Sequence, residues 1–511
     1  MSPSPFRLKP PAARVTRFVR LAGRGALPFA PNAARPMLRM PRAMAGDQVA
    51  TGPSLALLLA YLGAHAVLGI AMKKVPALAT AHALLSVAVA LYWAASSRGS
   101  GKVIMAVCYL AAAEVTWRMA KASVFWEFGK YAVCAVLLVA LVRHRPPRLN
   151  RLALLYFGLL IPSTLLTCLV YPDITTLRKA ISSPMSGPLA MTLCSIYFFR
   201  AKLTTLDQGK LLLAILGPVV GMGAVCALGT ASLGSDYEFT RNSNDDTSGG
   251  FGPNQVSATF GWGMLAAFLW MQRQRKLSFR WWLGAVLILF FAAQAALTFS
   301  RTGIWIGLIT IGAASLFMMR NPRNLLPTLA GALLVVGVFY FLIFPSLDNF
   351  TGHRLSERYA QKGFGKREDL ARIDLMLALR HPLLGVGAGM IPIESKKDLG
   401  IRSASHTEFT RLLAEHGLTG LLALGALLAM GAKTFRSAST PMEQSWTASF
   451  LAYSMLFMLV SGMRLVVPAV SIGLAMSRLI GWGNAPRNRG LPRPRRPLVG
   501  LVSPRAQPSA L

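Results

Sequence analysis

The chain has 511 residues, of which 54% are hydrophobic and 14% charged, and its 54 Lys and Arg exceed its 19 Asp and Glu by 35 charges. A soluble domain usually carries about 25% charged residues, so this composition excludes an ordinary water-soluble globule. A nucleic-acid-binding protein would place its cations on a folded polar surface. Here they lie between long apolar runs and at both ends of the chain, which favours a membrane protein without a nucleic-acid partner.

Residues 1–53 are predicted to form a disordered basic cytoplasmic arm. The arm is rich in Arg and lacks the continuous apolar core of a secretory signal. Translation starting at Met37, Met40 or Met44 would remove most of it, and an organellar transit peptide is the other alternative. A second disordered basic segment is predicted at 483–511. Both would contact anionic lipid headgroups.

Apolar stretches of nearly membrane-spanning length fill most of the chain between these ends. A bilayer core about 30 Å thick requires roughly 20 apolar residues per helix. The stretches run approximately over 54–72, 75–96, 103–117, 129–142, 152–170, 184–199, 210–231, 251–271, 281–298, 303–319, 327–345, 411–431, 448–463 and 465–482. We therefore predict an all-α polytopic membrane protein with about 12–14 transmembrane helices, whose membrane domain covers 54–482.

The distribution of charge predicts how these helices are oriented. Lys and Arg collect in cytoplasmic loops, and here they follow the even-numbered stretches, as at 143–148, with Lys73 and Lys74 as the exception. Twelve of the 19 acidic residues lie instead in the loops 232–250 and 346–410. These loops would face the periplasm of a bacterial inner membrane.

The loop 346–410 is long enough to be functional or disordered, and its sequence favours order. Residues 367–380 carry an apolar helical stripe, and three glycines at 385–389 indicate a turn. Ser405 to Glu408 have the S-x-x-E form of a capping box for a helix that leads into the next span. We predict a lid of helices over 346–410, lying against the outer membrane surface.

Several residues at the outer face could carry chemistry, and each also has a structural interpretation. Arg301 interrupts two apolar runs with a single cation, which is expensive and often functional, although Arg can also snorkel to lipid headgroups. The same alternatives hold for Arg241. Asn254 could cap its helix or face a polar ligand. His406 could exchange a proton near neutral pH or simply lie exposed at a helix start.

The lid offers further candidates. Arg367 and Arg372 could clamp phosphate as forked donors or pair with Glu368 and Asp369. Glu408 is a further candidate, and its structural interpretation is a capping role at the start of the helix. Neither Cys pairs at zinc spacing nor a Walker A sequence occurs in the chain, so we predict no metal and no cofactor.

These features together resemble the O-antigen ligase and O-antigen polymerase family of polytopic bacterial glycosyltransferases. The resemblance covers roughly 250–430, and its order and spacing around one long outer loop match the family arrangement. The segments that carry it are Phe-Gly-Pro-Asn-Gln at 251–255, Thr-Phe-Ser-Arg-Thr-Gly at 298–303, 367–372 leading to 381–389, and 405–420. Segments 114–119 and 125–131 also resemble a subgroup of these proteins, without an assigned role.

The resemblance implies a metal-independent, inverting transfer of a saccharide from undecaprenyl diphosphate at the periplasmic leaflet. The acceptor would be a hydroxyl of lipid A core, a glycan or another molecule. Preplaced Arg side chains suit a departing diphosphate, and the substrate-binding candidates are Arg301, Arg367, Arg372 and Arg241.

By the same resemblance, His406 would orient or deprotonate the acceptor hydroxyl. Many relatives have Asn after this His, whereas Thr407 and Glu408 follow here, so Glu408 could share the base role. Asn254 and Ser300 are the other candidate substrate contacts.

Three alternative functions remain open at this point. A polymerase would join lipid-linked repeat units of O-antigen or exopolysaccharide, and only the acceptor separates it from a ligase. A transporter of lipid-linked sugars would need a charged path across the midplane, whereas the candidate residues cluster at one face. A structural scaffold would not need an ordered lid with a protonatable residue.

Overall fold

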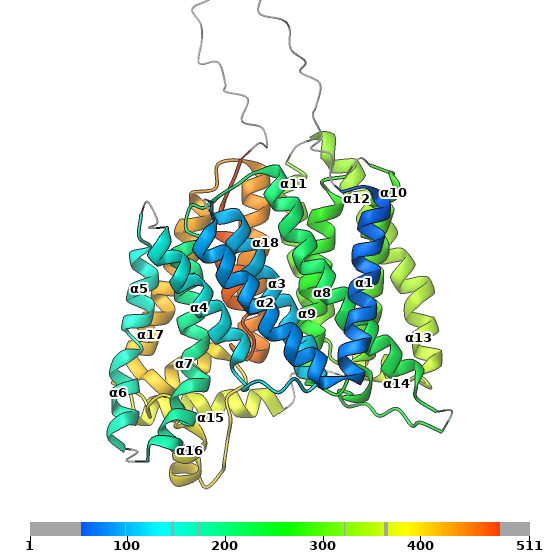
Figure 1. Cartoon of the computed structure of the whole chain (residues 1–511). Coiled ribbons are helices and arrows are strands. Elements are labelled where there is room, and N and C mark those ends of the chain that lie inside the picture. The colour runs from blue at the N-terminus through cyan, green and yellow to red at the C-terminus, as the bar shows by residue number, and fades with distance from the viewer. Residues whose placement is uncertain are drawn as a thin grey trace, which may run out of the picture. The chain divides into compact units, whose positions relative to one another are not determined.

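The computed structural model describes residues 53–480, apart from 98, 145–147, 171–172, 235, 275, 321 and 362–365. The predicted basic segment at 483–511 and all of the predicted arm except Pro53 lie outside the described residues. Within the described part nearly all regular structure is helical, which confirms the predicted fold class. The long helices run between two opposite ends of one bundle (Figure 1).

The first half of the described chain forms helices at the predicted apolar stretches. They are α1 (Leu55–Lys74), α2 (Pro76–Ser96), α3 (Ser100–Met119), α4 (Phe128–Arg143), α5 (Arg151–Gly158), α6 (Ile161–Val170), α7 (Ile174–Tyr197) and α8 (Thr205–Ala231). Only two residues separate α5 from α6, so these two helices together fill one predicted span.

The second half contains the remaining membrane helices and the lid. They are α9 (Pro253–Met271), α10 (Phe279–Leu297), α11 (Thr302–Met318), α12 (Pro322–Val338), a π-helical segment (Phe339–Ile343), α13 (Phe344–Phe350), α14 (Arg354–Ala360), α15 (Lys366–Arg380), α16 (Ile391–Leu399), α17 (Glu408–Arg436), α18 (Pro441–Ser461) and α19 (Val467–Ala475). Short elements are a 3₁₀ turn (Asp246–Ser248) and the strands β1 (Lys202–Leu203) and β2 (Arg478–Leu479).

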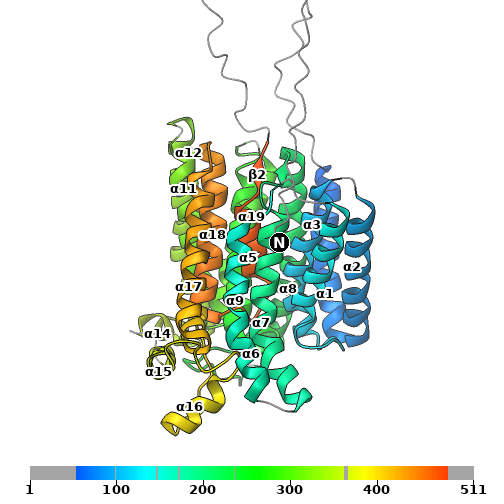
Figure 2. The same ribbon diagram turned by 90° about the vertical axis from the view of Figure 1, so that its left-hand side faces the viewer.

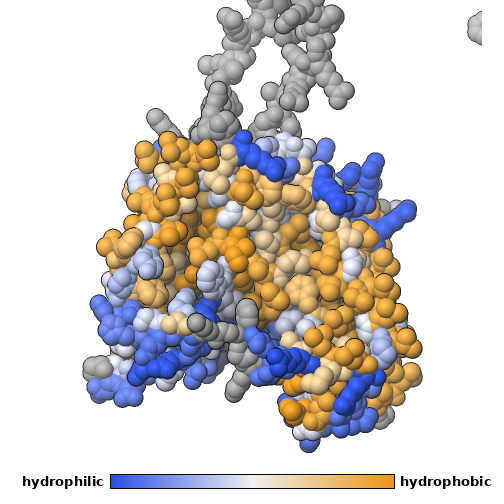
Figure 3. All heavy atoms as spheres, turned by 180° about the vertical axis from the view of Figure 1, so that it is seen from behind, coloured by the Kyte–Doolittle hydropathy of each residue, from blue (hydrophilic) through white to orange (hydrophobic). Residues whose placement is uncertain are grey.

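Seven helical segments of the described chain are long and apolar enough to cross a membrane. They are Leu55–Lys74, Pro76–Ser96, Arg151–Val170, Thr205–Ala231, Phe279–Leu297, Thr328–Phe350 and Glu408–Arg436. Other helices lie inside the bundle, and nearly every residue of α9 is buried. Apolar residues dominate the middle of the surface seen in Figure 3, and polar residues collect toward its two ends. The chain is a multi-pass membrane protein.

The predicted last span at 465–482 is wrong in its extent. Helix α19 has nine residues, all buried, and it rises only about 13 Å. It packs on α18, α7 and α3. Beyond it, Arg478 and Leu479 pair in parallel with β1 at the end opposite the lid (Figure 2). The apolar composition of this stretch therefore reflects burial in the protein core.

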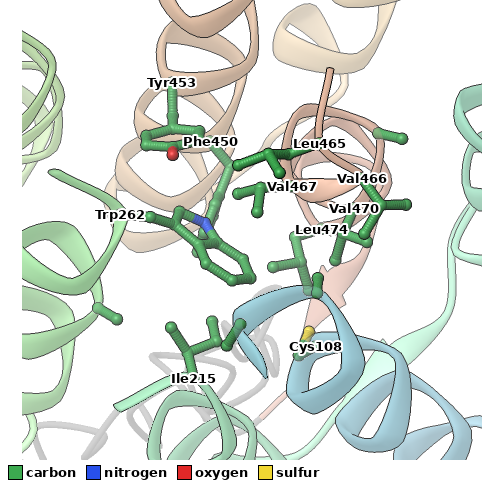
Figure 4. Packing of buried hydrophobic residues seen from close by; sticks show 14 of the residues in the cluster. Cys108, Ile215, Trp262, Phe450, Tyr453, Leu465, Val466, Val467, Val470 and Leu474 are labelled. Carbon is green, nitrogen blue, oxygen red and sulfur yellow. The ribbon is translucent and has the colours of Figure 1, made fainter. Parts of the chain in front are cut away.

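The core around α19 explains this burial (Figure 4). Trp262 from α9 points toward Leu474 of α19, its ring lies 6.2 Å from that of Tyr453 on α18, and Cys108 and Ile215 approach from α3 and α8. The Tyr453 hydroxyl donates to the carbonyl of Ala258 at 2.9 Å. Because lipid offers no hydrogen-bond partners, such internal pairing allows a polar group to lie within a membrane bundle.

The positive charge at the end of α1, which departed from the expected charge distribution, has a local partner. The Lys73 ammonium donates to the carbonyls of Met119 at 3.0 Å and Gly249 at 2.9 Å. Lys73 thereby ties the end of α1 to the end of α3. This contact explains a cation on the lid side.

Helices α14, α15 and α16 lie at one end of the bundle, within the segment 346–410 for which a lid was predicted, and we call them the lid (Figures 1 and 2). Helix α15 confirms the helix expected at 367–380, and the predicted glycine turn is present. In the turn, Gly385, Gly387 and Gly389 have φ of 68°, 96° and 74°. The turn packs on α17 where Gly417, with φ 55° and ψ −131°, interrupts the helix. The backbone N–H of Val386 donates to the carbonyl of Ala414 at 2.9 Å.

Candidate functional site

The corner between α10 and α11 positions Arg301. The Ser300 hydroxyl donates to the side-chain oxygen of Asn254 at 2.7 Å, and Ser257 donates to the Ser300 carbonyl at 2.9 Å. These contacts dock the corner on α9. The start of α9 has no side-chain cap, so Asn254 supports the corner, not the helix end. Arg301 follows directly and donates through Nη1 to the carbonyl of Gln361 at 2.6 Å.

Four arginines from distant parts of the chain gather beside this corner. They are Arg301, Arg358 on α14, Arg367 on α15 and Arg464 between α18 and α19, and we call them the arginine cluster. Burial and then the charges of Arg358, Arg301 and Arg464 lower the pKa of Arg367. Arg358 donates through Nε to the carbonyl of Phe299 at 3.0 Å. An anion placed among these like charges would relieve their mutual repulsion.

His406 lies against the arginine cluster in the extended segment before α17. Its side chain is half-buried. Burial, followed by the charges of Arg464 and Arg367, lowers the pKa of His406 to about 4. The imidazole is therefore neutral near pH 7 and can accept a proton.

The predicted capping box at the start of α17 is wrong. Thr407 caps the helix by accepting the N–H of Thr410 at 3.2 Å. The Ser405 hydroxyl instead donates to Asp374 on α15, and Glu408 is buried with 1% of its surface exposed. The contact with Asp374 of α15 thus replaces the capping hydrogen bond that Ser405 was predicted to make within α17.

Glu408 belongs to a buried ion group within α17. Arg411 donates through Nε to Glu408 at 3.0 Å, pairs also with Glu415, and donates to the carbonyl of Pro184 at 3.2 Å. This group lines a cavity of about 270 Å³, which we call the polar cavity. Its other polar lining residues are Lys130, Lys179, Ser183, Ser405, Thr407, Ser461 and Arg464.

The turn that carries Arg464 is held by α3. Glu114 accepts the backbone N–H of Val466 at 2.8 Å and pairs with Arg118 at 2.6 Å. Arg118 also donates to the carbonyl of Arg464 at 3.3 Å. The segment at 114–119, which had no role from sequence, therefore positions one member of the arginine cluster.

Helix α4 supports the same turn from its first residues. Lys130 is buried, pairs with Glu127, and donates to the carbonyl of Met463 at 3.1 Å. A Cβ on Gly129 would lie 2.7 Å from the Glu114 side chain. Only glycine therefore lets α4 approach α3 this closely.

Two sequence candidates lie at the surface. Arg241 pairs with Glu357 at 2.7 Å with 56% of its side chain exposed, and Arg372 lies on the exposed side of α15. Arg358 and Arg464 were missed by sequence reasoning. A signal for Arg464 exists, since it separates two apolar runs with one cation just as Arg301 does.

The described residues contain one group of side chains with metal-ligand chemistry, on the lid. His381, Glu394 and Asp398 place ligand atoms within 4.8 Å of one another. His381 contacts Asp398 at 3.0 Å, and Lys397 pairs with Glu394 at 3.2 Å. The His381–Asp398 contact joins the end of α15 to α16, and the Lys397–Glu394 pair lies within α16, so these contacts account for the group as a structural one.

Comparison with known proteins gives one family match. Residues 287–425 match the family model described as O-antigen ligase. The match spans Ser300, Arg301, the lid and His406, while Asn254 and Arg241 lie outside it. A search of curated proteins found no match. This part of the chain is therefore similar to the O-antigen ligase family, which agrees with the resemblance seen in the sequence.

Proposed function

We propose that the protein transfers a saccharide from an undecaprenyl-diphosphate-linked donor to an acceptor hydroxyl at the lid end of the bundle. The acceptor is a lipid A core, a glycan or another hydroxyl compound. The observation that carries the proposal is the convergence of the arginine cluster on a neutral His406. The arginine cluster suits the negative charge of the leaving diphosphate, and His406 suits the proton that the acceptor hydroxyl must lose.

In the proposed reaction, His406 takes the proton of the acceptor hydroxyl as its oxygen attacks the anomeric carbon. The bond from that carbon to the diphosphate oxygen breaks, and its electron pair leaves with the diphosphate. Attack opposite the leaving group inverts the anomeric centre. Arg301, Arg358, Arg367 and Arg464 stabilise the departing charge as fixed donors, so the reaction is proposed to be metal-independent.

The other site residues predicted from the sequence have supporting roles in the proposed reaction. Asn254 and Ser300 hold the corner that aims Arg301 and lie near the donor. A base role for Glu408 would require its oxygens to exchange Arg411 for the acceptor hydroxyl. Arg372 and Arg241 are proposed as outer contacts of the donor, with Arg241 leaving Glu357.

The lid end is proposed to face the periplasm from a bacterial inner membrane, with the basic termini on anionic lipids of the other side. Labelling tests this orientation. Lys396→Cys on the exposed lid helix α16 and Arg436→Cys at the far end of α17 are made in a Cys168→Ser background, because Cys168 is exposed. An impermeant thiol reagent added to intact spheroplasts should label only the first. Labelling of only the second would reverse the proposed orientation.

Transfer is tested with purified protein, an undecaprenyl-diphosphate glycan and competing acceptors. The acceptors are lipid A core and a second lipid-linked glycan, and the product separates a ligase from a polymerase. Arg301→Ala should lower transfer about 10²- to 10³-fold. The matched control is Arg320→Ala at the other end of α11, where Arg320 contacts Gln444 at 2.8 Å. Wild-type transfer by Arg301→Ala would refute the diphosphate role, and leaflet exchange without product would favour a transporter.

A further inference from the structure

A second cavity opens at the lid end, beside the polar cavity. It measures about 560 Å³ and is lined by Phe125 and Trp126, which precede α4, by Tyr131 of α4, and by Arg178, Lys179 and Ser183 of α7. We call it the aromatic groove. It includes the segment at 125–131 that resembled a subgroup of the family and that the proposed reaction leaves unused.

The aromatic rings in this groove are exposed on one side and supported on the other. Phe125 and Trp126 have 58% and 64% of their surfaces exposed. Phe125 contacts the ring of Tyr131, with centroids 5.8 Å apart, and the Arg118 guanidinium lies 4.6 Å from the Trp126 ring centroid. Fixed aromatic faces suit the C–H faces of pyranose rings, because a negative ring face attracts weakly positive hydrogens at little entropic cost.

The charged residues of the groove favour an anionic ligand. Arg178 and Lys179 are exposed at its edge, whereas the single carboxylate, Glu127, is buried and paired with Lys130. Tyr131 and Ser182 share a hydrogen bond of 3.0 Å and offer hydroxyls beside these cations. Together the aromatic faces and cations fit a saccharide that carries phosphate or carboxylate groups.

The groove leads toward the reaction site. Lys179 and Ser183 line both the aromatic groove and the polar cavity. The polar cavity is also lined by Ser405 and Thr407, the two neighbours of His406, and by Arg464. A saccharide seated on the aromatic rings can therefore extend along this path toward the proposed base.

We propose that the aromatic groove binds the acceptor, an anionic saccharide, and that the polar cavity receives its reacting end. This inference rests on the proposed transferase function and adds the acceptor class and its place. Exposed aromatic and basic residues also occur where helices anchor at a membrane interface. The experiment therefore separates acceptor binding from anchoring.

The test uses two variants of the full chain, Phe125→Ala and the double change Arg178→Glu with Lys179→Glu. A phosphorylated oligosaccharide and its neutral form serve as acceptors in steady-state transfer and in direct binding without donor. The double variant should raise the KM and Kd for the phosphorylated form about tenfold or more. Its KM for the donor and its values for the neutral form should stay within about twofold. Phe125→Ala should weaken binding of both forms.

Matched controls carry the same changes away from the groove. Trp305→Ala removes an exposed aromatic ring from α11, with 57% of its surface exposed, and Lys433→Glu with Arg436→Glu reverses two charges at the far end of α17. Neither should change acceptor KM. Unchanged acceptor KM and Kd in the groove variants would overturn the inference about the groove. If Arg301→Ala still loses transfer in that case, the proposed transferase function remains supported. Loss of membrane insertion in the groove variants but not in the controls, with unchanged acceptor Kd in the inserted protein, would overturn the inference and assign the groove to anchoring.

Discussion

Glu114 accepts the backbone N–H of Val466 at 2.8 Å across 352 positions of sequence. Its second oxygen pairs with Arg118 at 2.6 Å, and only 2% of the Glu114 side chain is exposed. A charge buried so completely requires both partners. One carboxylate on α3 therefore fixes the turn from which Arg464 donates to the carbonyl of Ser405, the residue before His406, at 3.4 Å.

Replacing this carboxylate should disturb both stability and transfer. Glu114→Ala leaves Arg118 unpaired and should cost about 3–5 kcal/mol of stability, together with a loss of transfer. Glu114→Gln keeps an acceptor for Val466 and should lose less. Glu394→Ala, in an exposed pair with Lys397, should change stability by less than about 1 kcal/mol. Thermal unfolding and transfer rates check these values, and equal effects of the Ala and Gln changes would argue against a positioning role.

The pH dependence of transfer should report His406. Its pKa of about 4 lies below the ordinary value, so the neutral form persists through the neutral range and is lost as pH falls through about 4. The profile of kcat/KM should show an acid limb there, since it reports the free enzyme. Bound diphosphate adds negative charge, so the limb in kcat should lie at higher pH. His406→Ala should be about 10²-fold slower and lack the limb. An unchanged limb in that variant would assign it to another group.

Arg464→Ala should affect transfer in two separable ways. Loss of one donor to the leaving diphosphate should lower kcat about 10²-fold. Loss of a positive neighbour should raise the pKa of His406, so the acid limb in kcat/KM should move to higher pH. A lower rate with an unmoved limb would show that Arg464 does not act on His406.

The glycine turn should be essential for docking the lid. A Cβ at Gly389 would lie 2.1 Å from the carbonyl oxygen of Ala180 on α7, so Gly389→Ala should displace the turn and expose the lid to proteolysis. Gly400 has a similar φ of 70° with open space around it. Gly400→Ala should cost only the left-handed backbone strain, about 1–2 kcal/mol. Equal protease sensitivity of the two variants would show that the contact with α7 is unimportant.

Local sequence patterns predicted the structure correctly where that structure depends on one segment alone. The apolar stretches form helices as predicted, because length and hydropathy are properties of one segment. Helix α15 was predictable from the spacing of its apolar residues, and the turn after it from the conformational freedom of its glycines. The same local reasoning failed at Ser405, where Asp374 from α15 offered a competing partner. It also failed for α19, since an apolar run looks the same whether lipid or protein covers it.

The sequence by itself determined a helical membrane protein with a lid between two apolar spans and an unusual cation at Arg301. Only the tertiary structure decided which charges meet. Arg301, Arg358, Arg367 and Arg464 come from separate elements, and their effect on one another depends on distance and burial, which no local pattern encodes. The neutral state of His406 arises from the same packing.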